Sequence, residues 1–272
     1  MTPGSFAVIL VHLVVAVLVT PLLIGVMRTV RARLEGRVGA GVWQPWRDLR
    51  KLLAKEPTRA PGSTPVLTLA PIVLMASSLM LCALIPLVST VALASVPGDL
   101  FVVVSVLLVG TVSLALLGLE SGTAFGGMGS SRHMVIAAMV EPTVLLSVYA
   151  LSVPAGTSDL AAIVQARVAD PISLLNPVSL LAIFALVVVV IAETGRLPVD
   201  NPSTHLELTM VHEAMILESG GRDLGWLELG SWLRLTALLG LVANLAVPWG
   251  VAPDAAPLSL LVGVGAVFAK LV

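Results

Sequence analysis

Runs of apolar residues, each about as long as a membrane-spanning helix, recur along the whole of this 272-residue chain. They lie at 6–27, 65–92, 100–119, 134–153, 175–193, 229–249 and 256–272. A helix needs about 20 mostly apolar residues to cross a bilayer. The chain is 57% hydrophobic and only 11% charged, a composition that rules out a soluble globular protein. We therefore expect an all-α polytopic membrane protein, a transmembrane helix bundle of about seven spans.

The hydrophilic segments between these runs are short. None of them is long enough to build a second core, so residues 1–272 are expected to form a single transmembrane domain. The first run follows no basic segment and is too long for the apolar part of a signal peptide. It is therefore expected to remain as the first span.

Positive charge is concentrated in one loop, at 28–63. Nine arginines and lysines there stand against Glu35, Asp48 and Glu56, which by the positive-inside rule makes the loop cytoplasmic and the N-terminus external. The loops at 120–133 and 194–228 are then cytoplasmic as well. Between Pro45 and Pro57 the pattern predicts a short amphipathic helix, which either lies at the lipid headgroups or docks a soluble partner.

Acidic residues occur inside or at the ends of three predicted spans. Glu141 lies about eight residues into the fourth span and is followed by Pro142. A charge at that depth is costly unless it faces the bundle interior, so the residue is a candidate proton relay. The alternative is a neutral carboxyl group that only bonds a neighbouring helix. Glu120 and Glu193 end the third and fifth spans and extend a candidate path toward the cytoplasm.

The segment 193–221 holds most of the other candidate groups. It carries Glu193, Asp200, Glu207, Glu213 and Glu218 with Arg196, His205 and His212. Thr204 and Glu207 form a capping box, and Gly220-Gly221 is a stop signal, so 205–219 is predicted to be helical. On such a helix Glu207 and Glu218 would lie opposite the histidines. Acids on both faces indicate a polar cavity or a partner surface.

Several other kinds of site are disfavoured by the residues. His205 and His212 would be about 10 Å apart along a helix, too far for one metal ion. A single cysteine, Cys82, cannot build an iron–sulfur cluster. The glycine-rich loop 120–133 carries no phosphate-binding pattern. The acidic segment has no counterpart elsewhere in the chain, which argues against a stand-alone transporter.

Three segments resemble one protein family. They are EGRVGAGVWQPWRDLRKLLAKE (35–56), GGMGSSRHMVIAAMVEP (126–142) and ETGRLPVDNPSTHLELTMVHEAMILESGGRDLG (193–225). The chain is similar to the membrane subunit of formate hydrogenlyase, hydrogenase 4 and related group 4 nickel–iron hydrogenases. That subunit is homologous to the H subunit of NADH:quinone oxidoreductase, and the family usually has one further span at its end.

The resemblance implies a non-catalytic subunit of an oxidoreductase complex in a bacterial inner membrane. It would anchor a soluble arm of large and small subunits, which hold the nickel–iron centre and iron–sulfur clusters, and join it to antiporter-like membrane subunits. This chain itself would bind no metal and no nucleic acid. By position, a proton path would include Glu120, Glu141, Glu193, Asp200, Glu207, Glu213 and Glu218. A quinone-like chamber or docking face would include Arg37, Arg196, His205 and His212.

Three alternatives stay open beside this coupling role. The first is the quinone-binding subunit of an NADH dehydrogenase, although THLELTMVHEAM at 204–215 is typical of the hydrogenase branch. The second is a stand-alone ion-coupled transporter. The third is a purely structural anchor whose buried acids are neutral packing groups.

Overall fold

A computed structural model describes residues 3–58, 62–90, 98–170, 176–197, 199–200, 210–252 and 257–271. Within these ranges the chain is helical and forms no extended strand. Its α-helices are α1 (Pro3–Leu34), α2 (Gln44–Leu53), α3 (Val66–Leu84), α4 (Leu100–Glu120), α5 (Ala124–Ser152), α6 (Leu160–Ala169), α7 (Pro177–Glu193), α8 (His212–Ile216), α9 (Gly221–Ala246) and α10 (Pro257–Leu271).

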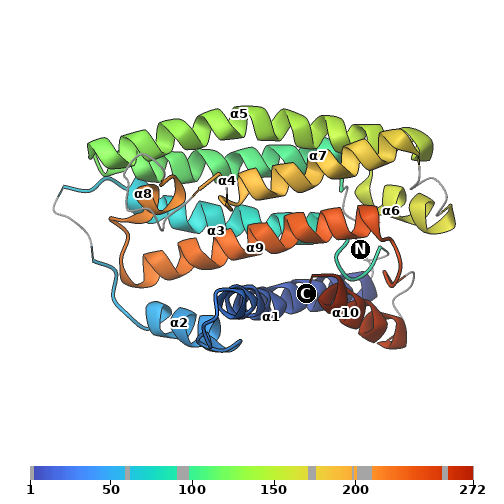
Figure 1. Cartoon of the computed structure of the whole chain (residues 1–272), viewed down its shortest axis with the longest axis horizontal. Helices are drawn as coiled ribbons and strands as arrows, with labels where there is room; N and C mark the ends of the chain where they lie inside the picture. Colours follow the sequence, from blue (N-terminus) through green and yellow to red (C-terminus); the bar gives the residue numbers. More distant parts are fainter. Residues whose placement is uncertain are drawn as a thin grey trace.

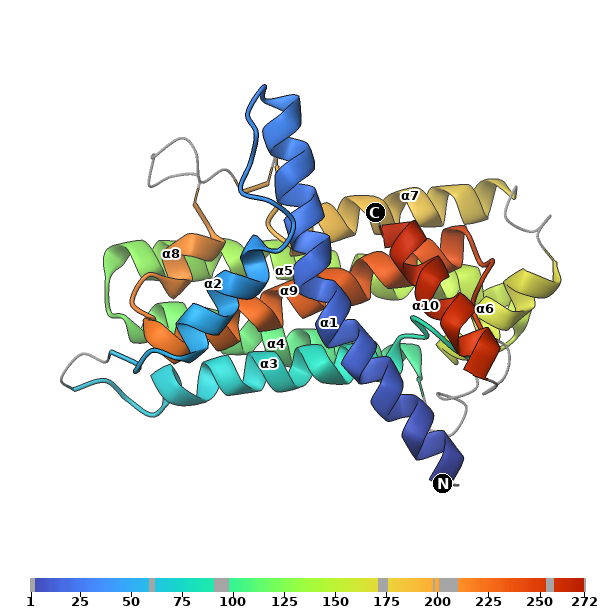
Figure 2. The same ribbon diagram turned by 90° about the horizontal axis from the view of Figure 1, so that it is seen from below.

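The long helices lie side by side along the length of the molecule (Figure 1). Helix α3 packs against α4 and α9, α4 against α5, and α5 against α7. Helix α1 crosses this bundle obliquely on one side, near α2 and α10 (Figure 2). The short helices α2 and α8 lie toward one end of the bundle, and α6 lies at the other.

The all-α membrane bundle predicted from the sequence is confirmed. Helices α1, α3, α4, α5 and α9 are long and apolar enough to cross a bilayer, while α7 and α10 are shorter apolar helices. These helices occupy the positions of the predicted apolar runs. Large apolar side chains point outward from α5 and α7, with Met139 and Leu181 each 70% exposed, as expected of a surface that faces lipid.

Side-chain caps explain where several helices begin. Asp99 accepts a hydrogen bond from the Phe101 amide at the start of α4, and Asn176 accepts one from Val178 at the start of α7, both at 3.2 Å. Asp159 does the same for Ala161 at the start of α6. Each cap satisfies a backbone N–H that has no partner within its own helix. Helix α6 lies between two predicted spans, where the hydropathy pattern predicts no helix.

The glycine-rich segment 120–133 is also helical for most of its length, which corrects the predicted loop. Thr123 caps the Gly126 amide at 3.1 Å, and α5 begins at Ala124. The glycines serve close packing: a Cβ on Gly129 would lie 2.9 Å from the Ala214 Cβ. Small residues let helices approach closely in membrane bundles.

The boundaries around the acidic segment differ from the prediction as well. Of the predicted helix 205–219, the capping box at Thr204 and Glu207 lies outside the described residues, and the described remainder is helical only at His212–Ile216. Gly221 begins α9 instead of ending a helix, about eight residues before the predicted span. Its φ is +57°, and a Cβ there would overlap the Glu56 carbonyl oxygen. The glycine is therefore required by contact with the loop after α2.

The amphipathic helix predicted between Pro45 and Pro57 is confirmed as α2. Leu49 is buried, whereas Arg47, Arg50 and Lys51 are not. The helix packs against α1 and α9, so its apolar side lies on the bundle.

Candidate functional site

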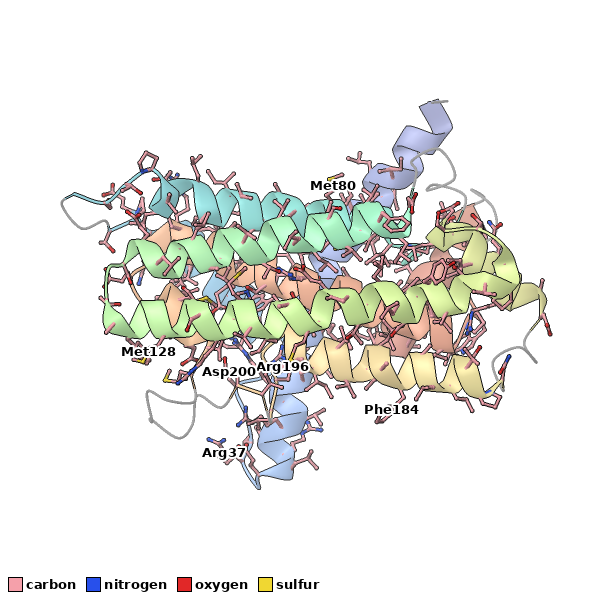
Figure 3. All side chains as sticks on the ribbon, turned by 90° about the horizontal axis from the view of Figure 1, so that it is seen from above. Arg37, Met80, Met128, Phe184, Arg196 and Asp200 are labelled. Atoms are coloured by element: carbon pink, nitrogen blue, oxygen red, sulfur yellow. The ribbon has the colours of Figure 1, made fainter. Side chains whose placement is uncertain are left out.

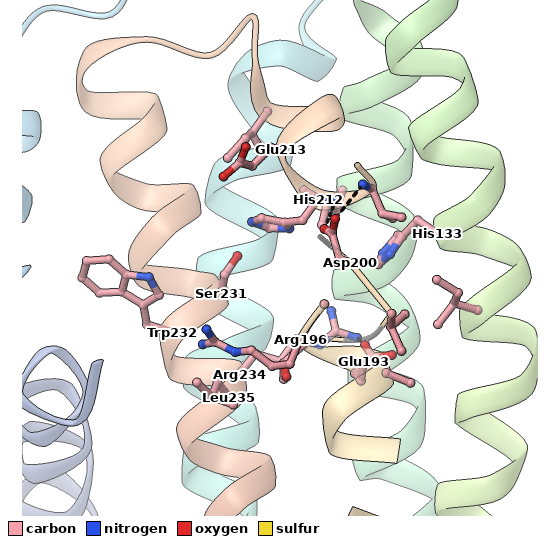
Figure 4. A pocket seen from close by; sticks show the side chains of 18 of the residues that line it. His133, Glu193, Arg196, Asp200, His212, Glu213, Ser231, Trp232, Arg234 and Leu235 are labelled. Atoms are coloured by element: carbon pink, nitrogen blue, oxygen red, sulfur yellow. Dashed lines mark hydrogen bonds and ion pairs between the residues drawn. The ribbon is translucent and has the colours of Figure 1, made fainter. Parts of the chain in front are cut away.

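A polar pocket of about 230 Å³ lies where the end of α7, the loop after it and α8 meet α4, α5 and α9. Figure 4 shows its labelled side chains converging from several elements. The charged and titratable residues of its lining are Arg28, His133, Glu193, Arg196, Asp200, His212, Glu213, Glu228 and Arg234. So many ionisable groups at the edge of an apolar bundle are expensive to keep, and such concentrations mark functional sites.

Two charged groups of the pocket form an ion pair, Glu193 at the end of α7 and Arg234 in α9. Both are buried, with 9% and 6% of their surfaces exposed. Arg234 also donates to the Leu107 carbonyl oxygen at 3.0 Å and to the Thr111 hydroxyl of α4. Removing a charge from water is costly unless a partner compensates it. Each of the two side chains therefore depends on the other for its place in the bundle.

Space for the Arg234 guanidinium is provided by Gly110 of α4. A Cβ on this glycine would lie 2.9 Å from the Arg234 Nη1 atom and 2.8 Å from the Ser77 hydroxyl of α3. Helices α3, α4, α7 and α9 thus meet around one cation.

Asp200 has a positional role in the pocket. Its carboxylate is 5% exposed and accepts hydrogen bonds from the backbone amides of Val211 at 3.2 Å and His212 at 2.9 Å. These bonds, dashed in Figure 4, fix the start of α8 against the loop after α7. A carboxylate at a helix N-terminus is favoured by the orphan amides and by the helix dipole. Asp200 therefore fixes the position of the His212 backbone.

Two histidines face this pocket. His212 is half-buried, and burial lowers its pKa. The nearby Asp200 carboxylate opposes that shift, while the charges of Arg196 and Arg234 add to it. His133 of α5 is 8% exposed, and its Nε2 atom has no hydrogen-bond partner among the described residues. The pocket wall therefore holds one imidazole nitrogen that is free to hydrogen-bond to a ligand.

Arg196 lies in the loop between α7 and α8. Burial lowers the pKa of its guanidinium, and the nearby charge of Arg28 adds to that effect. An arginine keeps its proton in proteins, so Arg196 and Arg28 both contribute positive charge to the pocket wall. The Arg28 guanidinium also lies 5.5 Å from the centre of the Trp232 ring, within the range of a cation–π interaction.

Glu141 lies beside the pocket but is not part of its lining. It is half-buried in α5, next to Thr111, and lies within electrostatic range of Glu193 and Arg234. Its Oε1 atom is buried and has no hydrogen-bond partner in the described part of the chain.

The pocket gathers Glu193, Arg196, Asp200, His212 and Glu213 from the candidate residues, with Glu141 next to it. Other candidates lie elsewhere. Glu120 accepts a hydrogen bond from the Thr64 hydroxyl at 2.7 Å, which ties α4 to the loop before α3. Glu218 is exposed.

Arg37 pairs with Glu35 on the loop after α1. In Figure 3 it lies apart from Arg196 and Asp200, and it does not line the pocket. His205 and Glu207 fall outside the described residues.

Sequence reasoning missed four residues of the pocket: Arg28, His133, Glu228 and Arg234. A signal existed for Arg234, because it interrupts the apolar run 229–249 and a charge within a span is a functional candidate by default. Arg28 and Glu228 stand just outside the predicted spans. His133 lies in a segment that the sequence pattern assigns to a loop.

Comparison with known proteins places the chain in a family. Residues 6–272 match the model of the NADH dehydrogenase family. Hydrogenase-4 component C of Escherichia coli is 31% identical over 245 residues, which cover 90% of this chain and 76% of that protein. Formate hydrogenlyase subunit 4 of the same organism is 30% identical over 241 residues, with 89% and 77% covered.

Subunits of respiratory complexes also match this chain. An H subunit of NADH-quinone oxidoreductase from Syntrophobacter fumaroxidans is 30% identical over 249 residues, with 86% of this chain and 73% of that protein covered. A solved structure of the membrane-bound sulfane sulfur reductase, an archaeal respiratory membrane complex, contains a chain with the same fold. Its TM-score is 0.81 at 22% identity, covering 98% of this chain and 86% of that one. The chain is a membrane protein of the NADH dehydrogenase family, homologous to hydrogenase-4 component C, formate hydrogenlyase subunit 4 and the H subunit of NADH-quinone oxidoreductase.

Proposed function

We propose that this chain is the ion-conducting and anchoring membrane subunit of a hydrogenase or formate hydrogenlyase complex. It couples redox chemistry in a soluble arm to proton movement across a bacterial inner membrane. The observation that carries the proposal is the buried ion pair of Glu193 and Arg234 beside an ionisable pocket, with the half-buried Glu141 on α5. A purely structural anchor has no need for an acid and a cation buried in its core, where each is costly.

The orientation follows from the basic loop at 28–63, which faces the cytoplasm. The pocket then opens toward the soluble arm, because α8 and α2 lie at the same end of the bundle. The partners are the large and small hydrogenase subunits, which hold the nickel–iron centre and iron–sulfur clusters, and antiporter-like membrane subunits. Protons would pass between the pocket and Glu141 by way of Glu193.

Experiments on the purified complex test this proposal directly. A tagged copy of the chain should co-purify in mild detergent with nickel, iron–sulfur absorbance and hydrogen-dependent dye reduction. In proteoliposomes, Glu193→Gln should leave dye reduction intact and lower the number of protons moved per hydrogen oxidised. Co-purified flavin and NADH oxidation without nickel would contradict the hydrogenase assignment.

Quinone binding is the second candidate, favoured by the free Nε2 atom of His133 in the pocket wall. A quinone carbonyl oxygen accepts a hydrogen bond from such a group. The pocket, at about 230 Å³, is smaller than sites for whole drug-sized ligands, which span about 300–1,000 Å³, so it fits a ring-sized group. His133 and His212 would hold the ring, which when bound would accept electrons from the soluble arm. This role requires quinone-dependent electron transfer in the purified complex and its loss in His133→Ala.

A further inference from the structure

Helix α2 packs on the flank of α9, near the start of that longer helix. A Cβ on Gly221, the first residue of α9, would overlap the Glu56 carbonyl oxygen just after α2. One turn later, a Cβ on Gly225 would lie 3.1 Å from the Leu53 Cδ2 atom and 3.3 Å from the Leu52 Cβ atom. The C-terminal end of α2 therefore lies beside the first turns of α9.

The N-terminal part of α2 lies farther along α9. Arg28 of α1 lies 3.9 Å from the Asp48 carboxylate of α2 and 5.5 Å from the centre of the Trp232 ring of α9. Because Trp232 follows Gly221 by about three turns, α2 runs alongside the first part of α9 in the opposite direction (Figure 1). The side of α2 that faces away from α9 therefore points sideways from the bundle and not along its axis.

The length of α9 sets the depth of this side. Its 26 residues extend about 39 Å, whereas the hydrocarbon core of a bilayer is about 30 Å thick. The apolar run of the sequence begins near Leu229, so the surplus length lies at the start of α9, in the headgroup layer. Because α2 flanks this part of α9, its C-terminal end lies among headgroups and its N-terminal end lies nearer the acyl chains.

The side of α2 that faces away from the bundle carries cations. Arg47, Arg50 and Lys51 are exposed, and at i, i+3 and i+4 they share one side of the helix. Among the residues that the structure describes, none of the three forms an ion pair. Asp48, the acid of this helix, faces Arg28 of α1 instead. The fold therefore leaves the positive charge of this side uncompensated.

Trp43 stands at the deeper end of the same side, four residues before Arg47, and is 63% exposed. Tryptophan is enriched where acyl chains meet headgroups, and the long stems of arginine and lysine reach from apolar surface to charged headgroups. We propose that the outer face of α2, formed by Trp43, Arg47, Arg50 and Lys51, binds the negatively charged headgroups of anionic phospholipids.

This proposal distinguishes the two roles that the sequence leaves open for the helix. Its apolar side already packs on the bundle, where Leu49 is 3% exposed, so α2 does not bind lipid by inserting that side. A soluble arm approaches along the bundle axis and meets the ends of the helices, whereas the outer face of α2 points toward the surrounding bilayer. Lipid headgroups are therefore the partner beside this face, and their charge is complementary to it.

Native mass spectrometry of the purified complex in a neutral detergent measures this binding. Phosphatidylglycerol is the anionic probe, and phosphatidylcholine, which has no net charge, is the matched lipid. Each cation near an anionic lipid surface strengthens binding about fivefold. The triple variant Arg47→Gln/Arg50→Gln/Lys51→Gln should therefore bind phosphatidylglycerol at this site roughly 100-fold more weakly and retain fewer of these lipids. Its retention of phosphatidylcholine should not change.

Single variants keep the test readable if the triple variant does not assemble. Lys51→Gln alone should weaken the site about fivefold. Arg132→Gln is its matched control, because it removes one cation from α5, on the opposite side of the bundle (Figure 1), and it should retain phosphatidylglycerol as the wild type does. Phosphatidylglycerol with brominated acyl chains should quench the tryptophan emission of the wild type more than that of Trp43→Phe.

Three outcomes would overturn the proposal. The first is equal retention of phosphatidylglycerol by the wild type and the triple variant. The second is an equal loss of both lipids, because the headgroup charge would then not matter. The third is loss of the soluble subunits with phosphatidylglycerol retained, which would make this face a protein-docking surface. None of these measurements uses hydrogen oxidation or proton transport, so they are independent of the proposed function.

Discussion

Asp200 allows a quantitative test of how the pocket is held together. Its two carboxylate oxygens accept one amide each, from Val211 and His212. In Asp200→Asn one oxygen becomes an NH₂ group that cannot accept a hydrogen bond, and the charge is lost. A hydrogen bond to a charged group contributes about 1.5–3 kcal/mol. The change should therefore make local opening of α8 roughly 10- to 150-fold more frequent, at about 1.4 kcal/mol per tenfold.

The rate of backbone hydrogen exchange, measured by mass spectrometry on the intact complex, reports how often α8 opens. The peptide covering 210–216 should exchange faster by that factor in Asp200→Asn. Asp159→Asn is a matched control, because Asp159 caps α6 in the same way through the Ala161 amide at the other end of the bundle. It should accelerate exchange at the start of α6 and leave 210–216 unchanged. Unchanged exchange at 210–216 in Asp200→Asn would refute the capping role.

Two further predictions concern pH and packing. Burial holds the pKa of His212 below its ordinary value of 6.5, so the folded state takes up this proton less readily than the unfolded chain. Stability should fall as the pH drops through about 6.5, and His212→Gln should flatten the pH dependence of the melting temperature; an unchanged profile would contradict this. A Cβ on Gly118 would overlap the Ser130 hydroxyl and lie 2.8 Å from the Met215 Cγ atom, so Gly118→Ala should destabilise the complex by about 1–3 kcal/mol. Gly127 has no neighbour within 4 Å of such a Cβ, so Gly127→Ala should melt at or above the wild-type temperature, and equal melting of the two variants would refute the packing argument.

The membrane fold could be predicted because hydropathy over 20 residues is a strong signal. Each apolar run corresponds to a helix, and the predicted amphipathic helix is present as α2. Boundaries were less predictable where glycine was interpreted by its intrinsic preference alone. Gly126 and Gly129 lie within α5, and Gly221 opens α9, because tertiary contacts with neighbouring segments require a residue without a Cβ.

The site was predictable only in part. Glu193, Arg196, Asp200, His212 and Glu213 are close in sequence and meet in one pocket. Arg234, His133 and Arg28 reach the same pocket from distant helices, and no spacing rule along the chain relates them to the acidic segment. Only the fold shows that Arg234 of α9 lies against Glu193 of α7.

The central claim is that Glu141 takes part in proton movement, and proteoliposomes that contain the purified complex test it most directly. The measurement is the number of protons translocated per hydrogen oxidised in Glu141→Gln and in a control, Glu35→Gln, which changes an exposed acid on the loop after α1; the iron–sulfur content is verified in both. We expect Glu141→Gln to lower this ratio while dye reduction continues, and Glu35→Gln to match the wild type. A wild-type ratio in fully assembled Glu141→Gln would contradict the account.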